Sequence, residues 1–271
     1  MKWILFFMTL PLFFSCSGKM IKRDIKDSSW DAFSNESFIR MDQQRLLKAL
    51  AQKDNMGCYV GDFKKTLAKF KDGYEKQKNE SYWLDIGTCF YLEGEYEKAE
   101  FYYRLVISES KNISIKSMTL NNLGLIYLHF GLWEKAHDYF NQAITTAPAF
   151  RVPRFNLALL YLQFGLYEKT ISIFTSTHFA RLKDVDIYLN LASAYLFSGD
   201  LAKAEEVFKL IPTESYRRED LAGAYALFLV EKGNMVEASK ILEQREKSDV
   251  APFHIMTQKI EKLIALKLHK D

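Results

Sequence analysis

Helix-breaking residues are scarce in this sequence, which has only 5 proline and 12 glycine residues among 271. Together with an aromatic content of 15%, this scarcity argues against a disordered chain. Strand patterns are also lacking, because alternations of apolar and polar residues are short and are never followed by the residue pairs that form hairpin turns. The sequence therefore predicts a folded chain that is helical almost throughout.

An excess of charge of one sign is missing as well. The 37 basic and 34 acidic residues are spread along the whole sequence, and the formal net charge is only +3. No block of lysine and arginine provides the positive footprint typical of nucleic-acid binding, so no nucleic-acid partner is expected. The hydrophobic content of 48% is enough for a sizeable core, and a helical array of this length is expected to form one cooperative domain.

Residues that carry catalysis or bind metals and cofactors do not occur in recognisable arrangements. The sequence contains no glycine-rich phosphate loop and no nucleophile elbow. The five histidines have no metal-ligand spacing among themselves or with the cysteines: His129, His137, His178, His254 and His269. We therefore expect no enzymatic activity, no cofactor, no metal ion and no small-molecule substrate.

The first fifteen residues have the pattern of an export signal. Met1 and Lys2 supply a positive start, and residues 3–14 form an uninterrupted apolar or neutral run. A run of roughly a dozen residues is short for a bilayer span, which needs about 20. We therefore interpret residues 1–15 as a signal peptide rather than as a stable membrane helix.

The end of this signal resembles the lipobox of bacterial lipoproteins. The segment Leu12-Phe13-Phe14-Ser15-Cys16 carries the resemblance, although Phe13 stands where the family prefers leucine. The resemblance implies that Cys16 is the lipid attachment site, that residues 16–40 form a lipidated tether, and that Ser17 favours transport to the outer membrane, facing the periplasm. Two or three buried acyl chains hold a protein to a membrane almost permanently. Ordinary cleavage after Ser17, without a lipid, is the alternative.

The sequence contains two further cysteines, Cys58 and Cys89. An exported location permits a disulfide bond between them. Isolated cysteines in helices are more often small core residues. Both interpretations are consistent with the sequence.

A repeat with a period near 34 residues runs through most of the chain. Glycines mark it at intervals of 37, 34, 34 and 34 residues: Gly94, Gly131, Gly165, Gly199 and Gly233. Seven residues before each of them stands a small residue: Gly87, Gly124, Ala158, Ala192 and Ala226. Five residues after each of them stands another: Ala99, Ala136, Thr170, Ala204 and Ala238. Because two antiparallel helices approach closely only where the facing side chains are small, each period predicts a helical hairpin.

This pattern resembles the tetratricopeptide repeat, most clearly in the segments 94–99 (GEYEKA) and 131–136 (GLWEKA). The resemblance implies an all-α fold, in which about five to six helical hairpins form a right-handed superhelix, or α-solenoid, with a C-terminal capping helix. Five repeat units are expected over residues 80–252, after a degenerate helical pair over residues 41–79. Residues 253–271 are expected to form the amphipathic capping helix.

In the tetratricopeptide family, the first helix of each hairpin lines a concave groove that binds peptides. The positions that point into this groove carry mostly apolar side chains here: Leu84, Tyr91, Leu92, Leu125, Leu128, His129, Phe155, Leu159, Leu162, Leu189, Leu196 and Phe197. An apolar groove of this extent should not face water permanently, so we expect an amphipathic helix or an extended apolar peptide of a partner to bind there. The alternative occupant is the chain's own tether, residues 20–40.

Three asparagines recur at 34-residue intervals on the same predicted helices: Asn122, Asn156 and Asn190. A ladder of amides can donate to and accept from a peptide backbone, as in some tetratricopeptide proteins, so these residues are also peptide-binding candidates. The alternative is that they bond to neighbouring backbone within the protein.

These features together predict a non-enzymatic scaffold that is lipid-anchored in the cell envelope and binds an apolar segment of another envelope protein. A lipobox followed by about six repeat units is similar to the pilotins that assist assembly of type IV pilus secretins in the outer membrane. The alternative function is an adaptor that recruits envelope enzymes, such as peptidoglycan hydrolases or proteases.

Overall fold

The computed structural model describes residues 63–77, 79, 81–247 and 251–268. Within these ranges the chain forms twelve α-helices and one short 3₁₀-helix, and it forms no β-strand. An isolated bridge between Arg218 and Glu246 is the one β-type pairing in the described part of the chain. The all-α fold predicted from the sequence is confirmed.

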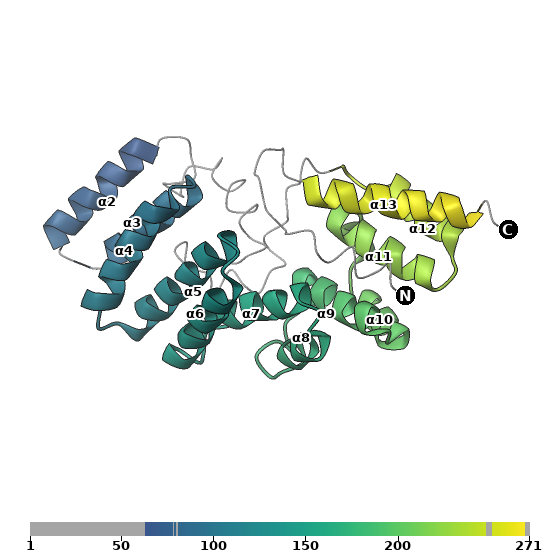
Figure 1. Ribbon diagram of the computed structural model, residues 1–271, viewed down its shortest axis with the longest axis horizontal. Helices are drawn as coiled ribbons and strands as arrows, with labels where there is room; N and C mark the ends of the chain where they lie inside the picture. The colour runs from purple at the N-terminus through teal and green to yellow at the C-terminus, as the bar shows by residue number, and fades with distance from the viewer. Residues whose placement is uncertain (1–62, 78, 80, 248–250, 269–271) are drawn as a thin grey trace. The chain divides into compact units, whose positions relative to one another are not determined.

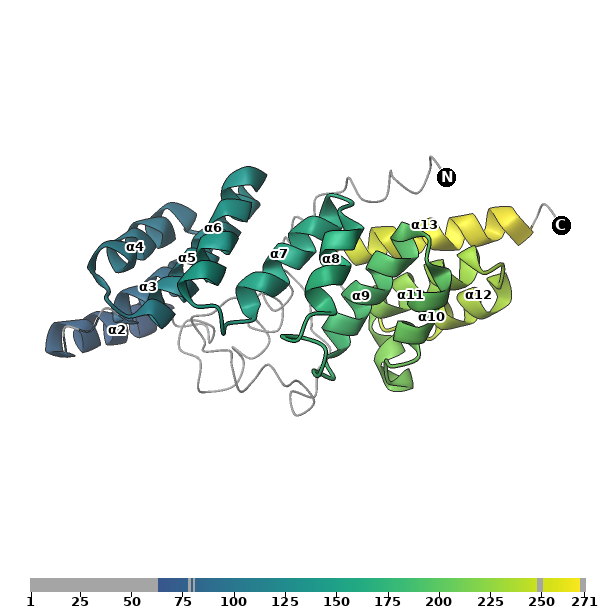
Figure 2. The ribbon, with the colours of Figure 1, turned by 90° about the horizontal axis from the view of Figure 1, so that it is seen from below.

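Consecutive helices pair into five hairpins, which are labelled in Figure 1 and seen from a second direction in Figure 2. In chain order they are α3 (Ser81–Leu92) with α4 (Tyr96–Glu109), α5 (Ile113–His129) with α6 (Trp133–Thr146), α7 (Val152–Gln163) with α8 (Tyr167–Phe174), α9 (Val185–Ser198) with α10 (Leu201–Phe208), and α11 (Glu219–Glu231) with α12 (Met235–Glu243). The 3₁₀-helix η4 (Thr213–Arg217) precedes α11. One hairpin therefore forms in each period of the sequence, as expected.

Two further helices flank the five hairpins. Before them, α2 (Phe63–Gln77) packs against α3, and after them α13 (Ala251–Leu268) packs against α11 and α12. The start of the predicted N-terminal pair, residues 41–62, lies outside the described residues. The capping helix begins two residues before the expected start at 253, because Pro252 is tolerated in the first turn of a helix.

The described part of the chain divides into two compact units, and the division lies inside α7, between residues 157 and 158. We call the described residues before this division the N-terminal unit and those after it the C-terminal unit. A single cooperative domain was expected from the sequence. A division is compatible with a repeat array, because each repeat contacts only its neighbours.

The five repeated glycines end the first helix of each hairpin in the same way. All five have a positive φ, between 72° and 89°. The residue after each glycine donates its backbone N–H to a carbonyl five residues back, as Glu95 does to Phe90 at 2.9 Å and Leu132 does to Tyr127 at 2.9 Å. This bond satisfies a carbonyl at the helix end, and the left-handed conformation that it requires is least costly for glycine.

In the first two hairpins, the two helices meet where a glycine faces a large ring. A Cβ atom added to Gly87 would lie 2.6 Å from Cε1 of Tyr103, and one added to Gly124 would lie 2.6 Å from Cε1 of Phe140. Both rings are completely buried. The close approach predicted from the small residues is therefore present, and the ring on the second helix fills the space that it leaves.

The capping helix is held by a buried charged residue of the last hairpin. Glu219 begins α11 and is 1% exposed, and its Oε1 atom accepts a hydrogen bond of 2.9 Å from the hydroxyl of Thr257 in α13. The same oxygen lies 3.3 Å from Nε of Arg245, and Nη1 of Arg245 lies 2.9 Å from the carboxylate of Glu261. Because a buried carboxylate is stable only when it is paired and hydrogen-bonded, these contacts fix α13 against α11.

Replacing Gly124 with valine should destabilise the protein by about 1–3 kcal/mol, because the new side chain would be forced against the ring of Phe140. The helix propensity of valine over glycine offsets only a few tenths of a kcal/mol. Urea unfolding followed by circular dichroism measures the change. A second substitution, Phe140→Leu, should recover part of the loss, so that the double variant is more stable than the sum of the two single changes predicts. Unchanged stability of Gly124→Val would show that the close approach does not hold the hairpin together.

Candidate peptide-binding face

The predicted groove residues of the N-terminal unit differ in exposure along each helix. Leu84, Tyr91, Leu125 and Phe155 are buried, whereas Leu92 and Leu128 are half-buried and His129 is exposed. The buried members contribute to the core. The side chains that a partner can reach are therefore those near the C-terminal ends of α3 and α5.

Aromatic rings gather at these two helix ends. The ring of Tyr96 lies 4.0 Å from that of His129, 5.4 Å from that of Tyr91 and 5.8 Å from that of Phe130, measured between centroids. Phe130 is 53% exposed, and Leu132 beside it is 42% exposed. Although His129 remains exposed, the neighbouring rings remove part of its water, and this desolvation lowers the pKa of the imidazole below its ordinary value. The neutral ring is therefore favoured, and it packs here as an aromatic side chain.

The predicted groove residues of the C-terminal unit are mostly half-buried. They lie on α7 and α9, and they are Leu159, Leu162, Leu189, Asn190 and Phe197, whereas Leu196 is buried. The ring of Phe197 stacks on that of Tyr167 with centroids 6.1 Å apart. These first helices therefore present large apolar side chains that the unit itself covers only in part.

Two of the three repeated asparagines belong to a buried network. The side-chain amide of Asn156 in α7 donates to Oδ1 of Asn121 in α5 at 2.8 Å, and the amide of Asn121 donates to Oδ1 of Asn122 at 3.1 Å. The amide of Asn122 lies 3.3 Å from the hydroxyl of Tyr103 in α4 and 3.5 Å from that of Thr88 in α3. All five side chains are buried. Burial raises the pKa of the Tyr103 phenol, so the hydroxyl remains a donor.

This geometry favours the second interpretation of the asparagines, in which they bond within the protein. The amides of Asn122 and Asn156 join three consecutive hairpins through side chains rather than backbone. Asn190 does not join them, because its amide donates to the backbone carbonyl of Asp186 in its own helix at 2.7 Å. Asn190 is also the one member of the three that is only half-buried. It is therefore the member of the predicted ladder most accessible to a partner.

Tyr103 is a member of this network that the sequence interpretation missed. A large residue recurs nine positions after each turn glycine, and all five are buried: Tyr103, Phe140, Phe174, Phe208 and Leu242. The spacing signal was therefore available in the sequence. Tyr103 differs from its equivalents in having a hydroxyl group. This hydroxyl accepts a hydrogen bond from the side-chain amide of Asn122.

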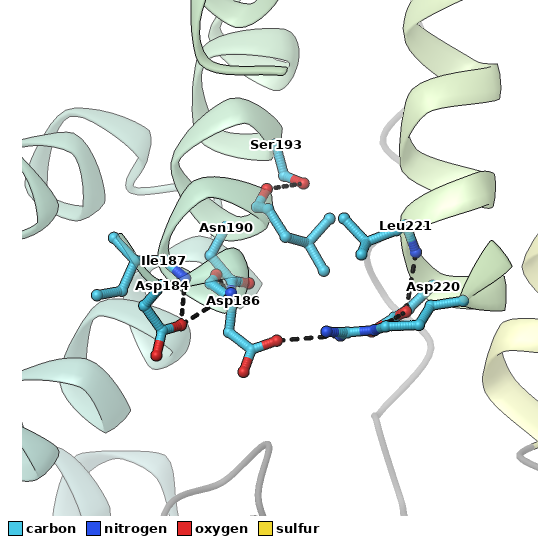
Figure 3. A network of polar contacts seen from close by, with 9 residues as sticks. Asp184, Asp186, Ile187, Asn190, Ser193, Asp220 and Leu221 are labelled. Carbon is cyan, nitrogen blue, oxygen red and sulfur yellow. Dashed lines mark hydrogen bonds and ion pairs between the residues drawn. The ribbon is translucent and has the colours of Figure 1, made fainter. Parts of the chain in front are cut away.

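A second polar network lies at the start of α9 and α11, as Figure 3 shows. Arg218 contacts two carboxylates: its Nη2 atom lies 3.0 Å from Oδ1 of Asp186 and 2.6 Å from Oδ2 of Asp220, and its Nε atom donates to Asp220 at 3.1 Å. Burial alone would lower the pKa of the Arg218 guanidinium, but the charges and hydrogen bonds of Asp220 and Asp186 outweigh it, so that the pKa is raised. The network joins the fourth and fifth hairpins and keeps Arg218 charged.

In the part of the chain that the structure describes, no group of three or more histidine, cysteine or acidic side chains is arranged to hold a metal ion. No helix in this part is long and apolar enough to cross a bilayer. The predicted lipid attachment site, Cys16, lies outside the described residues.

Comparison with known proteins identifies the repeat. A family model described as tetratricopeptide repeat matches residues 80–113 and 185–211. The BBSome complex member BBS4 of Bos taurus is 29% identical over 108 residues, which cover 36% of this chain and 20% of that protein. The chain thus corresponds to about a fifth of the length of this curated relative.

Solved structures with the same fold cover most of the chain. A tetratricopeptide repeat protein from Parabacteroides merdae has a TM-score of 0.60 and 21% identity, and the match covers 84% of this chain and 92% of that one. PilW, a widely conserved type IV pilus biogenesis factor, has a TM-score of 0.59 and 18% identity, with 74% and 91% covered. At these identities the likeness shows the fold alone. The five hairpins and these matches together show that the chain has a tetratricopeptide repeat fold, and they indicate no catalytic family.

Proposed function

We propose that this protein is a non-enzymatic scaffold of the cell envelope. In this proposal a lipid on Cys16 holds it to the outer membrane, facing the periplasm, and the first helices of its hairpins bind an apolar or amphipathic segment of a partner envelope protein. The observation that carries the proposal is the half-burial of large apolar side chains on α7 and α9, namely Leu159, Leu162, Leu189 and Phe197.

The composition of this face favours an apolar ligand. Single exposed apolar residues are ordinary on a protein surface, but here half-buried ones recur on the consecutive first helices α7 and α9. Covering one leucine or phenylalanine contributes about 1.5–3 kcal/mol, so that three or four contacts support useful affinity after the ordering costs. None of the predicted groove positions carries lysine or arginine, which a clamp for a terminal carboxylate requires. A partner segment would therefore be recognised by its apolar side chains.

The buried asparagine network argues against binding of a peptide backbone by the repeated amides. Because the amides of Asn122 and Asn156 already bond to Tyr103 and Asn121, they do not need a peptide backbone to satisfy them. We therefore assign recognition of the partner to the apolar side chains. Of the three repeated asparagines, Asn190 is the one whose side-chain amide a partner can reach. An amphipathic helix, which satisfies its own backbone, suits such a surface.

The state of Cys89 supports an exported location. Cys89 is completely buried and takes part in a disulfide bond. Disulfides persist in oxidising compartments such as the bacterial periplasm and are rare in the cytosol. This agrees with the signal-like residues 1–15.

The pilus proposal rests on likeness of fold. PilW, whose structure covers most of the chain, is a type IV pilus biogenesis factor. We propose that this protein assists assembly of an envelope complex such as a type IV pilus secretin, by binding one of its apolar segments before or during insertion in the outer membrane. Crosslinking in membranes, followed by identification of the bound protein, distinguishes this role from recruitment of peptidoglycan hydrolases or proteases.

Combining Leu162→Glu with Leu189→Glu should weaken binding of the crosslinked partner by at least about 100-fold, because two apolar contacts are lost and two charges must be desolvated. Helicity by circular dichroism should be unchanged. The matched control combines Phe101→Glu with Val236→Glu, which add the same charge at positions 59% and 74% exposed on second helices. If the first pair leaves binding intact, or if the control pair weakens it equally, the first helices are not the binding face.

Replacing Cys16 with alanine should release the protein from membranes into the soluble envelope fraction, because the acyl chains would have no attachment site. Fractionation with a carbonate wash measures the release, and incorporation of a labelled fatty acid measures lipidation directly. Ser17→Ala is the control, since it changes the neighbouring residue and leaves the thiol. Membrane association that survives Cys16→Ala would contradict the lipid anchor.

Deletion of the gene in a piliated host should abolish surface pili and leave the secretin as unassembled monomers. Immunoblots under conditions that preserve the secretin multimer measure assembly, and electron microscopy measures the pili. Expression of the Leu162→Glu, Leu189→Glu variant should fail to restore them, whereas the control pair should restore them. Intact pili in the deletion strain would reject the pilus role and leave the scaffold proposal to be judged by its own binding test.

A further inference from the structure

Helix α2 differs in charge from the second helices of the hairpins. It carries five lysines and two acidic residues, whereas each second helix of the five hairpins carries at least as many acidic as basic residues. The excess is concentrated in residues 63–71, which contain four lysines and no acidic residue: Lys64, Lys65, Lys69 and Lys71. We call these four side chains the basic patch. All four are exposed.

This excess of lysine is not a feature of the repeat. Helices α2, α4, α6 and α8 each begin with an aromatic residue, and the next residue is Lys64 in α2 but glutamate in the other three, namely Glu97, Glu134 and Glu168. Glutamate is favourable there because the N-terminal end of a helix carries partial positive charge, and lysine is unfavourable for the same reason. Helix stability therefore does not account for Lys64.

The contacts of α2 with α3 leave the basic patch on its outer side. Phe70 and Tyr74 pair with rings of α3, at 6.4 Å from Tyr82 and 4.7 Å from Trp83 between centroids. Beside them, a Cβ atom added to Gly73 would lie 2.6 Å from Cε1 of Tyr82. Because these contacts fix one side of α2 on α3, the basic patch lies on the exposed remainder of the helix surface.

The protein does not fully neutralise the charge of the basic patch. No acidic side chain in the described ranges forms an ion pair with Lys64, Lys69 or Lys71, whereas Asp72 in the second half of α2 pairs with Lys76 at 2.6 Å. Lysines at this density repel one another, because their unit charges are held close together on one helix. An anionic surface beside the patch would relieve this repulsion.

The surroundings of the patch favour lipid headgroups over a protein as that surface. Protein interfaces are enriched in aromatic side chains and depleted in lysine at their centre. Among the described side chains of α2, no large apolar one is exposed, and lysine is the most frequent exposed residue. Clusters of lysine near a membrane anchor are instead typical of contact with anionic lipids.

We propose that the basic patch lies on the anionic headgroups of the membrane that carries the protein. Each lysine close to such a surface strengthens binding roughly fivefold. This inference rests on the lipid anchor proposed above, and α2 is the described helix nearest in sequence to Cys16. Because acyl chains would already hold the protein, the patch sets the orientation of the N-terminal unit on the bilayer rather than the strength of attachment.

Amine labelling on vesicles tests this contact. Full-length lipoprotein purified from membranes is inserted into preformed vesicles of phosphatidylcholine, or of equal parts phosphatidylcholine and phosphatidylglycerol, and a water-soluble acylating reagent is added. Mass spectrometry should find Lys64, Lys69 and Lys71 labelled several-fold more slowly on the anionic vesicles. Concentrated salt should remove this protection, because it screens the attraction. The exposed lysines Lys111 and Lys247, which lie outside α2, should be labelled equally on both.

Equal labelling of the patch on both kinds of vesicle would overturn the proposal. Protection of the patch in isolated envelopes but not on protein-free anionic vesicles would also overturn it, and would assign the patch to an acidic protein.

Charge reversal supplies a second readout that does not depend on the lipid. Exported protein with Cys16→Ala is sedimented with the anionic vesicles. Adding Lys64→Glu and Lys69→Glu should weaken its binding by at least about 20-fold. It should not lower Tm, because Lys64→Glu introduces the residue that three other repeats have there. The matched control, Lys111→Glu with Lys247→Glu, changes the same charge at exposed positions outside α2 and should leave binding unchanged.

Failure of the lipid anchor is distinguishable from failure of the patch. If labelled fatty acid is not incorporated at Cys16, the anchor proposal is wrong, and the sedimentation experiment still decides whether the patch binds anionic lipid. Equal weakening by the two pairs of substitutions would show that binding follows net charge, and no weakening by Lys64→Glu with Lys69→Glu would show that α2 is not the contact. Either result overturns the proposal.

Discussion

The first two hairpins of this protein depend on one contact, in which a glycine on the first helix lets a large ring of the second helix reach the axis between them. Gly87 with Tyr103 and Gly124 with Phe140 show it most directly, since an added Cβ would lie 2.6 Å from either ring. The contact fixes how closely the helices approach and how they are rotated about their axes. It therefore also decides which side chains of the first helix enter the core and which remain on the outer face for a partner.

Contacts between hairpins are of a different kind from contacts within them. Within a hairpin they repeat every 34 residues and are mainly apolar. Between hairpins, polar groups that occur once add to the apolar contacts, as with the amides of Asn121, Asn122 and Asn156 or the pairing of Arg218 with Asp186. Such buried groups contribute little net stability, but an alternative stacking would leave them unsatisfied. They therefore favour the observed packing of neighbouring hairpins over alternative packings.

The sequence predicted the repeated part of the fold and little of the remainder, for a physical reason. Gly94 and its equivalents, and the small residues around them, recur because the same backbone turn and the same close approach recur, so that the spacing alone reveals them. The partner of Asn122 could not be predicted in this way, because Tyr103 has phenylalanine or leucine at the equivalent positions of the other repeats. Arg218 and Glu219 were missed for the same reason, since a charge that is used once leaves no period. For the candidate site, the sequence predicted which helices carry it. It could not predict which of their side chains are buried, such as Phe155, and which stay accessible, such as Leu162, because this depends on how neighbouring helices pack.

The buried carboxylate of Glu219 sets a rule for how the number of repeats in this protein can change. Its partners Arg245 and Thr257 follow the last hairpin. The three residues therefore form a closure, by which we mean the contacts that hold the capping helix α13 on the last hairpin. A hairpin gained or lost upstream of α11 leaves that closure intact, whereas one inserted after α12 would separate the carboxylate from both partners. Recombination between similar repeats can therefore lengthen or shorten this array from within, while its C-terminal end stays the same.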